Sequence, residues 1–492
     1  MKKQITKKVF AFIIVTMMFS VNAYSQVAKG VHSRIKHKNF QFMFNRNHEL
    51  RTNSNPFVQP PNEPVARFHT PSLCSKKTYG GSEDEYFGYV LKLNDGNYML
   101  YGNSESGDGD FSSNHGEDDG YLIKIDAAGN TLWAKTYGGS GEDGFNQIIE
   151  KPNGDIIAVG FAENNDGDVS GSHGDLDGWL VKLDKDGNIK SQQCYGGSAE
   201  DAFEAIVKGN GNSYIISGYV ASDDGDLTGA GNHGGDGDAW VLKINNNGTI
   251  AWQKCIGGSD YEQFTSVISI NNKYYVSGVT WSFDGDATQN HSAPGNFDQF
   301  LAKLKPNGDI VWTACHGGSN ADYCINQSLV AATDGNLINV GTTLSTDGDV
   351  QGHVNYEADA WFPKISAATG ALISQRCYGS VTRMQGFYSA MPAPGGGFIC
   401  VGTEASAFDI DSTWNAMVIK IDANGNEVWK KIFGGSDQDV VDGLVRMDNG
   451  DYLLACYSRS ADGDVTNQHG NGDIWMVELG NCCGNNNRET KI

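Results

Sequence analysis

Proline, basic residues and long apolar runs are all scarce in this chain of 492 residues. Only 11 prolines occur, and five of them lie between residues 56 and 71, so most of the chain lacks the residue that interrupts strand ladders. Lys and Arg number 36 against 59 Asp and Glu, a formal net charge of −23. This balance argues against nucleic acid or an anionic membrane as a partner, since both require basic patches.

A single apolar run, Val9–Val21, follows four lysines and precedes the small-residue stretch Ala23-Tyr24-Ser25. This pattern predicts a signal peptide over residues 1–25 and an exported protein that is periplasmic, cell-surface or extracellular. The alternative, a retained anchor, would need an apolar run of about 18 residues. The rest of the chain predicts no membrane insertion after cleavage. Residues 26–72, basic and containing the clustered prolines, are predicted to be a linker or tail.

Catalytic and metal-binding motifs are also missing. The sequence has no Gly-x-Ser-x-Gly elbow, no His-Glu-x-x-His and no phosphate-cradling loop. None of the ten cysteines forms a Cys-x-x-Cys pair with further metal ligands, which argues against zinc. The sequence therefore predicts a protein that is not an enzyme.

What the chain does contain is one short motif that occurs seven times. Each copy is a bulky residue followed by Gly-Gly-Ser, or by Gly-Ser in one case, and the copies lie 55 to 62 residues apart. This sequence is here called the Gly-Gly-Ser motif, and its leading residues are Tyr79, Tyr137, Tyr195, Ile256, His316, Tyr378 and Phe433. A period of this length, filled with short apolar runs between Gly, Asn and Asp turns, is typical of one propeller blade per repeat.

The strand pattern within each repeat predicts an all-β fold, a seven-bladed β-propeller of four-stranded antiparallel blades over residues 73–480. Tryptophan recurs at one fourth-strand position (Trp133, Trp252, Trp312 and Trp429), which suits packing between blades. The third strand of the blade is expected seven times, at 121–125, 179–183, 240–244, 300–304, 361–365, 417–421 and 475–479.

The fourth strand follows a third strand only six times, because residues 481–492 form a polar tail. Residues 73–79 have the missing pattern at the other end of the chain, so we expect this N-terminal outer strand to complete the last blade and close the ring. That alignment brings Cys74 near Cys482 and Cys483 and predicts a disulfide, with unpaired terminal thiols as the alternative.

Aspartate repeats in the loops between second and third strands. The loops carry Asp-Gly-Asp, and a further Asp precedes the third strand. Carboxylates so spaced suit a hard cation, so calcium sites are predicted; the alternative is that the Asp side chains only cap turn amides. The predicted ligands are Asp108, Asp110, Asp119, Asp166, Asp168, Asp177, Asp224, Asp226, Asp238, Asp284, Asp286, Asp298, Asp347, Asp349, Asp359, Asp462, Asp464 and Asp473.

A binding site normally breaks the symmetry of its ring. The strongest departures from the repeat are Trp281, Arg383, Met384 and Trp414, which are therefore binding candidates. They lie on the face that carries the acidic loops.

The repeat, as spelled by Tyr195-Gly-Gly-Ser, Asp201, Asp224-Gly-Asp226 and Asp238-Ala-Trp-Val-Leu-Lys243, resembles the bacterial seven-bladed β-propeller repeat family found in exported proteins of Bacteroidetes type. That resemblance implies the fold and carries no catalytic residue. We expect a monomeric binding or scaffold module whose acidic face meets a protein or glycan. The alternative is a glycan-active or other hydrolytic enzyme with its site on the same face.

Overall fold

The computed structural model describes residues 70–325, 327–353, 358–406 and 413–481. The predicted signal peptide and most of the predicted linker lie outside these residues, as do Cys482 and Cys483. The part of the chain from Thr70 onward is one compact unit. No helix of the described residues has the length and apolar character needed to cross a membrane.

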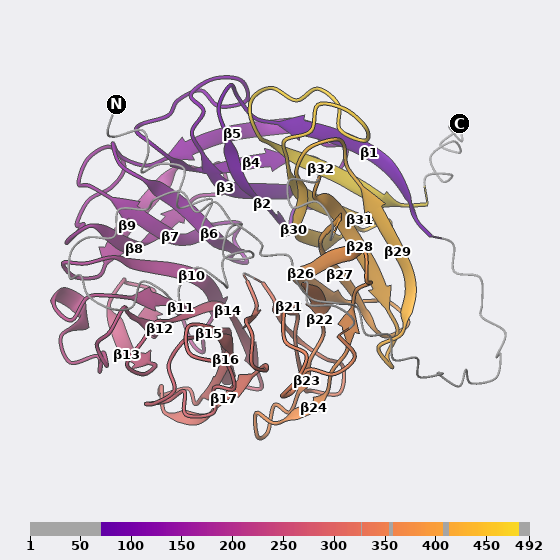
Figure 1. The fold of residues 1–492 in the computed structure, drawn as a ribbon. Coiled ribbons are helices and arrows are strands. Elements are labelled where there is room, and N and C mark those ends of the chain that lie inside the picture. The colour runs from indigo at the N-terminus through magenta and orange to yellow at the C-terminus, as the bar shows by residue number, and fades with distance from the viewer. Residues whose placement is uncertain (1–69, 326, 354–357, 407–412, 482–492) are drawn as a thin grey trace, which may run out of the picture. The chain divides into compact units, whose positions relative to one another are not determined.

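The described residues form an all-β fold, as predicted, with eight four-stranded antiparallel sheets. Figure 1 shows how these sheets are arranged. Three regular sheets come first. The first contains β2 (Glu85–Lys92), β3 (Tyr98–Ser104), β4 (Asp119–Ile125) and β5 (Thr131–Tyr137), and the second contains β6 (Asp143–Glu150), β7 (Ile156–Glu163), β8 (Leu176–Leu183) and β9 (Ile189–Tyr195). The third contains β10 (Asp201–Lys208), β11 (Ser213–Val220), β12 (Asp238–Asn245) and β13 (Ile250–Ile256). A short 3-10 helix, η2 (Gly225–Leu227), follows β11.

Three further sheets are equally regular. They are β14 (Glu262–Ile270), β15 (Lys273–Thr280), β16 (Asp298–Leu304) and β17 (Ile310–His316); β26 (Arg383–Pro392), β27 (Phe398–Ser406), β28 (Asn415–Ile421) and β29 (Glu427–Phe433); β30 (Asp439–Arg446), β31 (Tyr452–Ser458), β32 (Asp473–Gly480) and β1 (Ser72–Tyr79).

The remaining two sheets are small and share one stretch of chain, residues 322–378, here called the split segment. One sheet contains β18 (Asp322–Tyr323), β21 (Gly341–Thr343), β22 (Asp359–Trp361) and β25 (Cys377–Tyr378). The other contains β19 (Leu329–Ala331), β20 (Leu337–Asn339), β23 (Lys364–Ile365) and β24 (Leu372–Ser374).

The third strand expected at residues 361–365 is therefore not continuous. Pro363 lies between β22 and β23, at the position that Val181 occupies in β8. Proline has no N–H to donate to the ladder, so a central strand that contains it is interrupted. The stretch from Asp322 to Ala331 is also two residues longer than β10 (Asp201–Lys208) at the matching place, so the inner strand is broken there as well.

The hydrophobic core lies between consecutive sheets. Tyr89 and Leu122 of the first regular sheet pack in one cluster with Phe145 and Trp179 of the next. Similar clusters join each following pair of sheets, including the split segment with its two neighbours. Strands with both faces against neighbouring sheets bury apolar residues on both sides, which explains their nearly continuous apolar runs.

The two ends of the folded unit meet in one sheet. Strand β1, indigo in Figure 1, pairs antiparallel with β32, in yellow, from Ser72 opposite Gly480 to Tyr79 opposite Ile474. A further cluster contains Leu100 and Ile123 of the first regular sheet together with Leu453 and Met476 of the last. The last sheet thus packs against the first.

Candidate functional site: the acidic loop end

Antiparallel topology places two sets of loops at one end of the sheets. These are the turns between consecutive sheets and the loops between second and third strands, together called the acidic loop end. It comprises residues 80–84, 105–118, 138–142, 164–175, 196–200, 221–237, 257–261, 281–297, 317–321, 344–353, 358, 379–382, 413–414, 434–438 and 459–472. Arg459 is the one Lys or Arg in these sequences, and Arg383 begins the adjacent strand β26. This end of the unit is therefore strongly acidic.

The first aspartate of each Asp-Gly-Asp sequence holds the Gly-Gly-Ser motif of its own repeat. The Asp108 Oδ1 atom accepts the Ser82 N–H at 2.7 Å, and the contact recurs at 2.7 or 2.8 Å in all six copies. In each of these exposed carboxylates, one oxygen therefore accepts a hydrogen bond from the backbone. The other aspartates of this kind are Asp166, Asp224, Asp284, Asp347 and Asp462.

The second aspartate of each Asp-Gly-Asp sequence contacts the Gly-Gly-Ser motif through its backbone N–H. The Asp110 N–H donates to the Gly80 carbonyl at 2.9 Å. Gly109 between the two aspartates has φ +66°, and a Cβ there would lie 2.2 Å from the same carbonyl oxygen, so this position requires glycine. The same backbone contact is made by Asp168, Asp226, Asp286, Asp349 and Asp464.

The third aspartate is buried. Asp119 is fully buried, and its Oδ2 atom accepts the His115 N–H at 2.7 Å and faces His115 Nδ1 at 2.8 Å. The loop histidines therefore orient these carboxylates one by one. Asp177, Asp238, Asp298 and Asp473 have the same partnership with His173, His233, His291 and His469, whereas Asp359 lies 3.8 Å from His353 Nε2.

Five of the six buried aspartates, all except Asp359, meet a second buried acid that follows the next Gly-Gly-Ser motif. Asp143 Oδ2 accepts the Gly139 N–H at 2.6 Å, and a Cβ on Gly138 would lie 2.3 Å from Asp119 Oδ1 and 2.8 Å from Asp143 Oδ2. The two carboxyl groups therefore flank one glycine, an arrangement here called the seam pair. The partners Asp119–Asp143, Asp177–Asp201, Asp238–Glu262, Asp298–Asp322 and Asp473–Glu85 form five such pairs, and Asn415–Asp439 is an amide version.

Burial controls the ionisation of the seam pairs. Desolvation raises the pKa of Asp143 to about 7, that of Asp201 to about 6 and that of Glu85 to about 8, although the neighbouring amides and hydroxyls oppose the shift. Desolvation likewise raises the pKa of Asp119. Two carboxylates this close repel each other when both are ionised, so the pair favours holding a proton.

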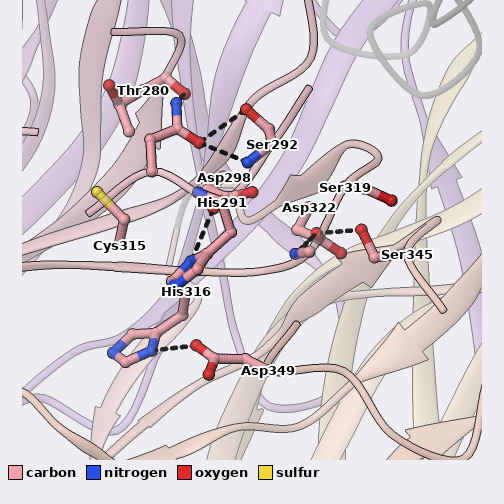
Figure 2. A network of polar contacts seen from close by, with 12 residues as sticks. Thr280, His291, Ser292, Asp298, Cys315, His316, Ser319, Asp322, Ser345 and Asp349 are labelled. Atoms are coloured by element: carbon pink, nitrogen blue, oxygen red, sulfur yellow. Dashed lines mark hydrogen bonds and ion pairs between the residues drawn. The ribbon is translucent and has the colours of Figure 1, made fainter. Parts of the chain in front are cut away.

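Figure 2 shows the seam between the β14–β17 sheet and the split segment. Asp298 is held by His291, and Asp322 accepts hydrogen bonds from the Ser345 hydroxyl at 2.6 Å and from the Gly318 N–H at 2.7 Å. The leading residue of the Gly-Gly-Ser motif here is His316, whose Nδ1 atom lies 2.9 Å from Asp349 Oδ2 and whose Nε2 lies 2.9 Å from the Gly370 carbonyl.

The three aspartates predicted as calcium ligands thus have separate structural tasks. Within the described residues, no group of three or more His, Cys, Asp or Glu side chains is arranged to hold a metal ion. The turn-capping roles of the first and third aspartates are those of the alternative interpretation. Calcium at the remaining carboxylate oxygens stays a prediction.

An aromatic row crosses the acidic loop end. The Trp281 ring lies 5.2 Å from that of Tyr261 and 4.2 Å from that of Phe297, and the row continues to Tyr219 and Tyr323. Trp281 and Tyr261 are half-buried, while the other three rings are buried. Trp281 was a binding candidate from the sequence, but the row was not predicted.

Sequence comparison of the turns could have found the row. At the position of Tyr261 the other Gly-Gly-Ser repeats have no aromatic residue: they have Asp84, Glu142, Glu200, Ala321 and Gln438. Pairing Tyr261 with Trp281 requires the contact between the turn and the next loop, in which the Trp281 N–H donates to the Tyr261 carbonyl at 3.0 Å.

The other binding candidates are separated. Arg383 is half-exposed, with its Nε atom 3.8 Å from Glu404 Oε1, whereas Met384 is buried. The carbonyl of Trp414 accepts the Asp439 N–H. Seven cysteines of the described residues are free, and Cys74 is not among them. Because Cys482 and Cys483 lie outside the described residues, the disulfide stays a prediction.

No family model matches the sequence, and the search of curated proteins found no match. Solved structures similar to this chain include the WD40 β-propeller domain of Doa1 (11% identity, 84% of this chain and 97% of that chain, TM-score 0.45) and the WD40 domain of Neurospora crassa Pan2 (10%, 83% and 95%, 0.45). A quinohemoprotein alcohol dehydrogenase from Comamonas testosteroni is also similar (10%, 84% and 77%, 0.43). Likeness at these identities concerns the fold alone.

Proposed function

We propose that this chain is an exported, monomeric, non-enzymatic binding module, and that its acidic loop end engages a basic protein surface around the Tyr261–Trp281 pair. The observation that carries the proposal is a half-buried aromatic pair within loops that contain one basic residue. Aromatic side chains supply most of the energy at the centre of an interface, and surrounding charges steer the partner.

The proposed scaffold is a closed seven-bladed propeller. The two small sheets would be one blade, since β18–β25 follow the order of a single repeat and Pro363 accounts for the break. The pairing of β1 with β32 would then complete the seventh blade. Closure supports a binding role because it holds the loops of all repeats on one rigid end.

The non-enzymatic part of the proposal is supported by how the buried acids are used. Asp322 accepts hydrogen bonds from a backbone amide and a serine hydroxyl, and its repeat partners likewise accept backbone amides. Carboxyls bound in this way hold the turns together. Calcium is proposed at the exposed Asp-Gly-Asp carboxylates, where one oxygen is left by the serine amide contact.

The test uses an array of synthetic peptides, basic with and without an aromatic residue, and a parallel array of neutral and acidic glycans. We expect basic aromatic peptides to bind, with affinity that falls as NaCl increases. Trp281→Ala should weaken this binding roughly tenfold or more. Leu132→Ala, at an exposed apolar residue of β5, is the matched control and should bind like the native chain.

A second candidate, glycan binding, is favoured by the same aromatic row, because sugar rings stack on aromatic faces. Salt-independent binding to a glycan that Trp281→Ala abolishes would replace the protein partner with a glycan. Binding that is unchanged in Trp281→Ala would reject this site. Hydrolysis of an arrayed glycan, abolished by one Asp→Asn change at this end, would overturn the non-enzymatic proposal.

A further inference from the structure

A cavity of about 500 Å³ lies at the opposite end of the sheets, between the split segment and the β26–β29 sheet. Its lining includes Ser374 of β24, Phe362, Phe398 of β27 and the turn 422–426 that joins β28 to β29. The volume is in the range of small-molecule sites, roughly 300–1,000 Å³. The acidic loop end does not contribute to it.

The cavity lies where four other repeats have a tryptophan. Ser374 lies opposite Lys364 in the sheet register, and at this place four other fourth strands carry Trp133, Trp252, Trp312 and Trp429 opposite the matching lysines. Three of these indoles cover a glycine in the turn between the third and fourth strands of the next repeat: a Cβ on Gly187, Gly308 or Gly370 would lie 2.7 to 2.9 Å from a carbon of the indole.

Strand β9 also has a serine at this place, Ser191 opposite Lys182, but its space is filled in another way. The Gln193 side chain covers the turn there, since a Cβ on Gly248 would lie 2.5 Å from the Gln193 Oε1 atom. At the position of Gln193 the split segment has Arg376.

Gly425 is the corresponding glycine beside Ser374. A Cβ there would find its nearest neighbours at 3.7 Å, the Arg376 Cδ and the Tyr378 hydroxyl. The space that an indole or a glutamine fills in those repeats is therefore open at this turn. Phe362 and Phe398, with ring centroids 5.4 Å apart, form an apolar wall of the same space.

The polar wall is rich in donors. Arg376 Nη1 donates to the Gly425 carbonyl at 2.6 Å and to Asn426 Oδ1 at 2.8 Å, and Lys364 pairs with Asp334 at 2.6 Å. Among the described residues, the Arg376 Nε and Nη2 groups have no acceptor, and neither does the Ser374 hydroxyl. The acceptor oxygens of Asp422 are occupied by Asn424 and Asn426 of its own turn.

We propose that this cavity binds a small molecule with a flat ring and an anionic group. The ring takes the place of the missing indole beside Phe362 and Phe398, and the anion is bound by Arg376 and Lys364. Flat apolar rings fit because four sister repeats pack an indole at this position. An anion fits because an arginine fork with free N–H groups suits a carboxylate.

The experiment titrates the full chain with indole-3-acetate by calorimetry, with indole-3-ethanol and acetate as the neutral and ring-free probes. We expect indole-3-acetate to bind at least roughly tenfold more tightly than either. Ser374→Trp should abolish binding while the melting temperature stays equal or rises, because the indole fills the cavity as in the sister repeats.

Arg376→Gln introduces the residue that β9 has at the matching position, Gln193. This change should weaken indole-3-acetate binding roughly tenfold. Lys135→Gln is the matched control, since Lys135 contacts the corresponding turn, at the Asp186 carbonyl and Asn188 Oδ1, in a repeat whose space is filled by Trp133. Absence of binding to the native chain, or equal binding by Arg376→Gln or by a folded Ser374→Trp variant, would overturn the proposal.

Discussion

At the scale of single residues, the seam pairs set the chemistry of the sheet junctions. Asp298 and Asp322 flank Gly317, and a Cβ on that glycine would lie 2.4 and 2.6 Å from their oxygens. Only glycine lets two carboxyls approach the backbone this closely. Where the repeat has Asn415 in place of the aspartate, the remaining acid Asp439 faces a neutral amide, so two ionised carboxylates do not meet there.

The seam pairs predict a pH-dependent stability. Burial raises the pKa of Asp322 and Asp143 to about 7, above the value near 4 that an exposed aspartate has. An acid whose pKa is raised in the folded state contributes its full stability below about pH 4 and loses it progressively as the pH rises from there through about 7. We expect the free energy of unfolding, measured with urea, to fall over this window by on the order of 2–4 kcal/mol per pair at most.

Asp322→Asn removes one titrating carboxyl of its seam pair and should flatten the part of this profile that Asp322 contributes. Asp334→Asn is the control. Lys364 and the Asn336 amide lower the pKa of Asp334 to about 2, so Asp334 makes stability depend on pH only below about pH 4 and should leave the profile between pH 5 and 8 unchanged. An unfolding free energy that is constant between pH 5 and 8 would contradict protonated seam pairs.

At the scale of elements, the junction of β1 and β32 joins chain ends that are about 400 residues apart. Seven residue pairs align along these strands, with a bulge between Leu73 and Ser75. Lys76 adds an ion pair at 3.1 Å to Asp464 of an Asp-Gly-Asp loop. The strand therefore secures both a sheet and one loop of the acidic end.

Deletion of residues 73–79 is expected to expose the edge of β32 and the core cluster against which Leu73 packs, and so to cause unfolding or aggregation. Size-exclusion chromatography with light scattering and circular dichroism would detect either outcome. Deletion of residues 26–70 is the control and should leave a monomer with native melting temperature. A stable monomer without 73–79 would show that β1 is dispensable.

A disulfide between Cys74 and one of the two C-terminal cysteines is predicted to link the same chain ends covalently. A non-reducing peptide map should show Cys74 linked to Cys482 or Cys483 if the ends are bridged, and free thiols at all three would refute the disulfide.

At the scale of the whole molecule, charge is the dominant property. The chain carries −23, and the acidic loop end has Arg459 as its one basic residue. Like charges concentrated at one end repel one another and weaken the folded state, unless a cation or basic partner neutralises them. This repulsion is the physical reason to expect calcium or a basic ligand there.

Millimolar calcium should raise the melting temperature more than sodium chloride of equal ionic strength, because ligand binding to the native state alone adds RT ln(1 + [L]/Kd) of stability. Differential scanning calorimetry would measure this shift of the melting temperature, with magnesium as a second control. Asp108→Asn and Asp166→Asn should reduce the calcium shift in proportion to the loops removed. Equal shifts in calcium and sodium would assign these loops to turn capping alone.

Much of this architecture could be predicted from the sequence. The spacing of the Gly-Gly-Ser motifs and the alternation of apolar residues identified strands such as β8 and β12 to within a few residues, because each repeat obeys the same burial pattern. The break at Pro363 was not predicted, although a proline within an expected central strand was a visible warning. The Asp-Gly-Asp loops were located correctly, but the partners of the buried carboxylates depend on the neighbouring repeat.

The sequence alone determined the all-β class, the repeat, the acidic charge and the expected pairing of the chain ends, because these follow from local periodicity and composition. Only the tertiary structure decided which atoms meet between repeats. The seam pairs, the row from Tyr219 to Tyr323 and the cavity beside Ser374 each join residues of successive repeats. Such contacts depend on how sheets stack, and no single repeat encodes the surface that its neighbour presents.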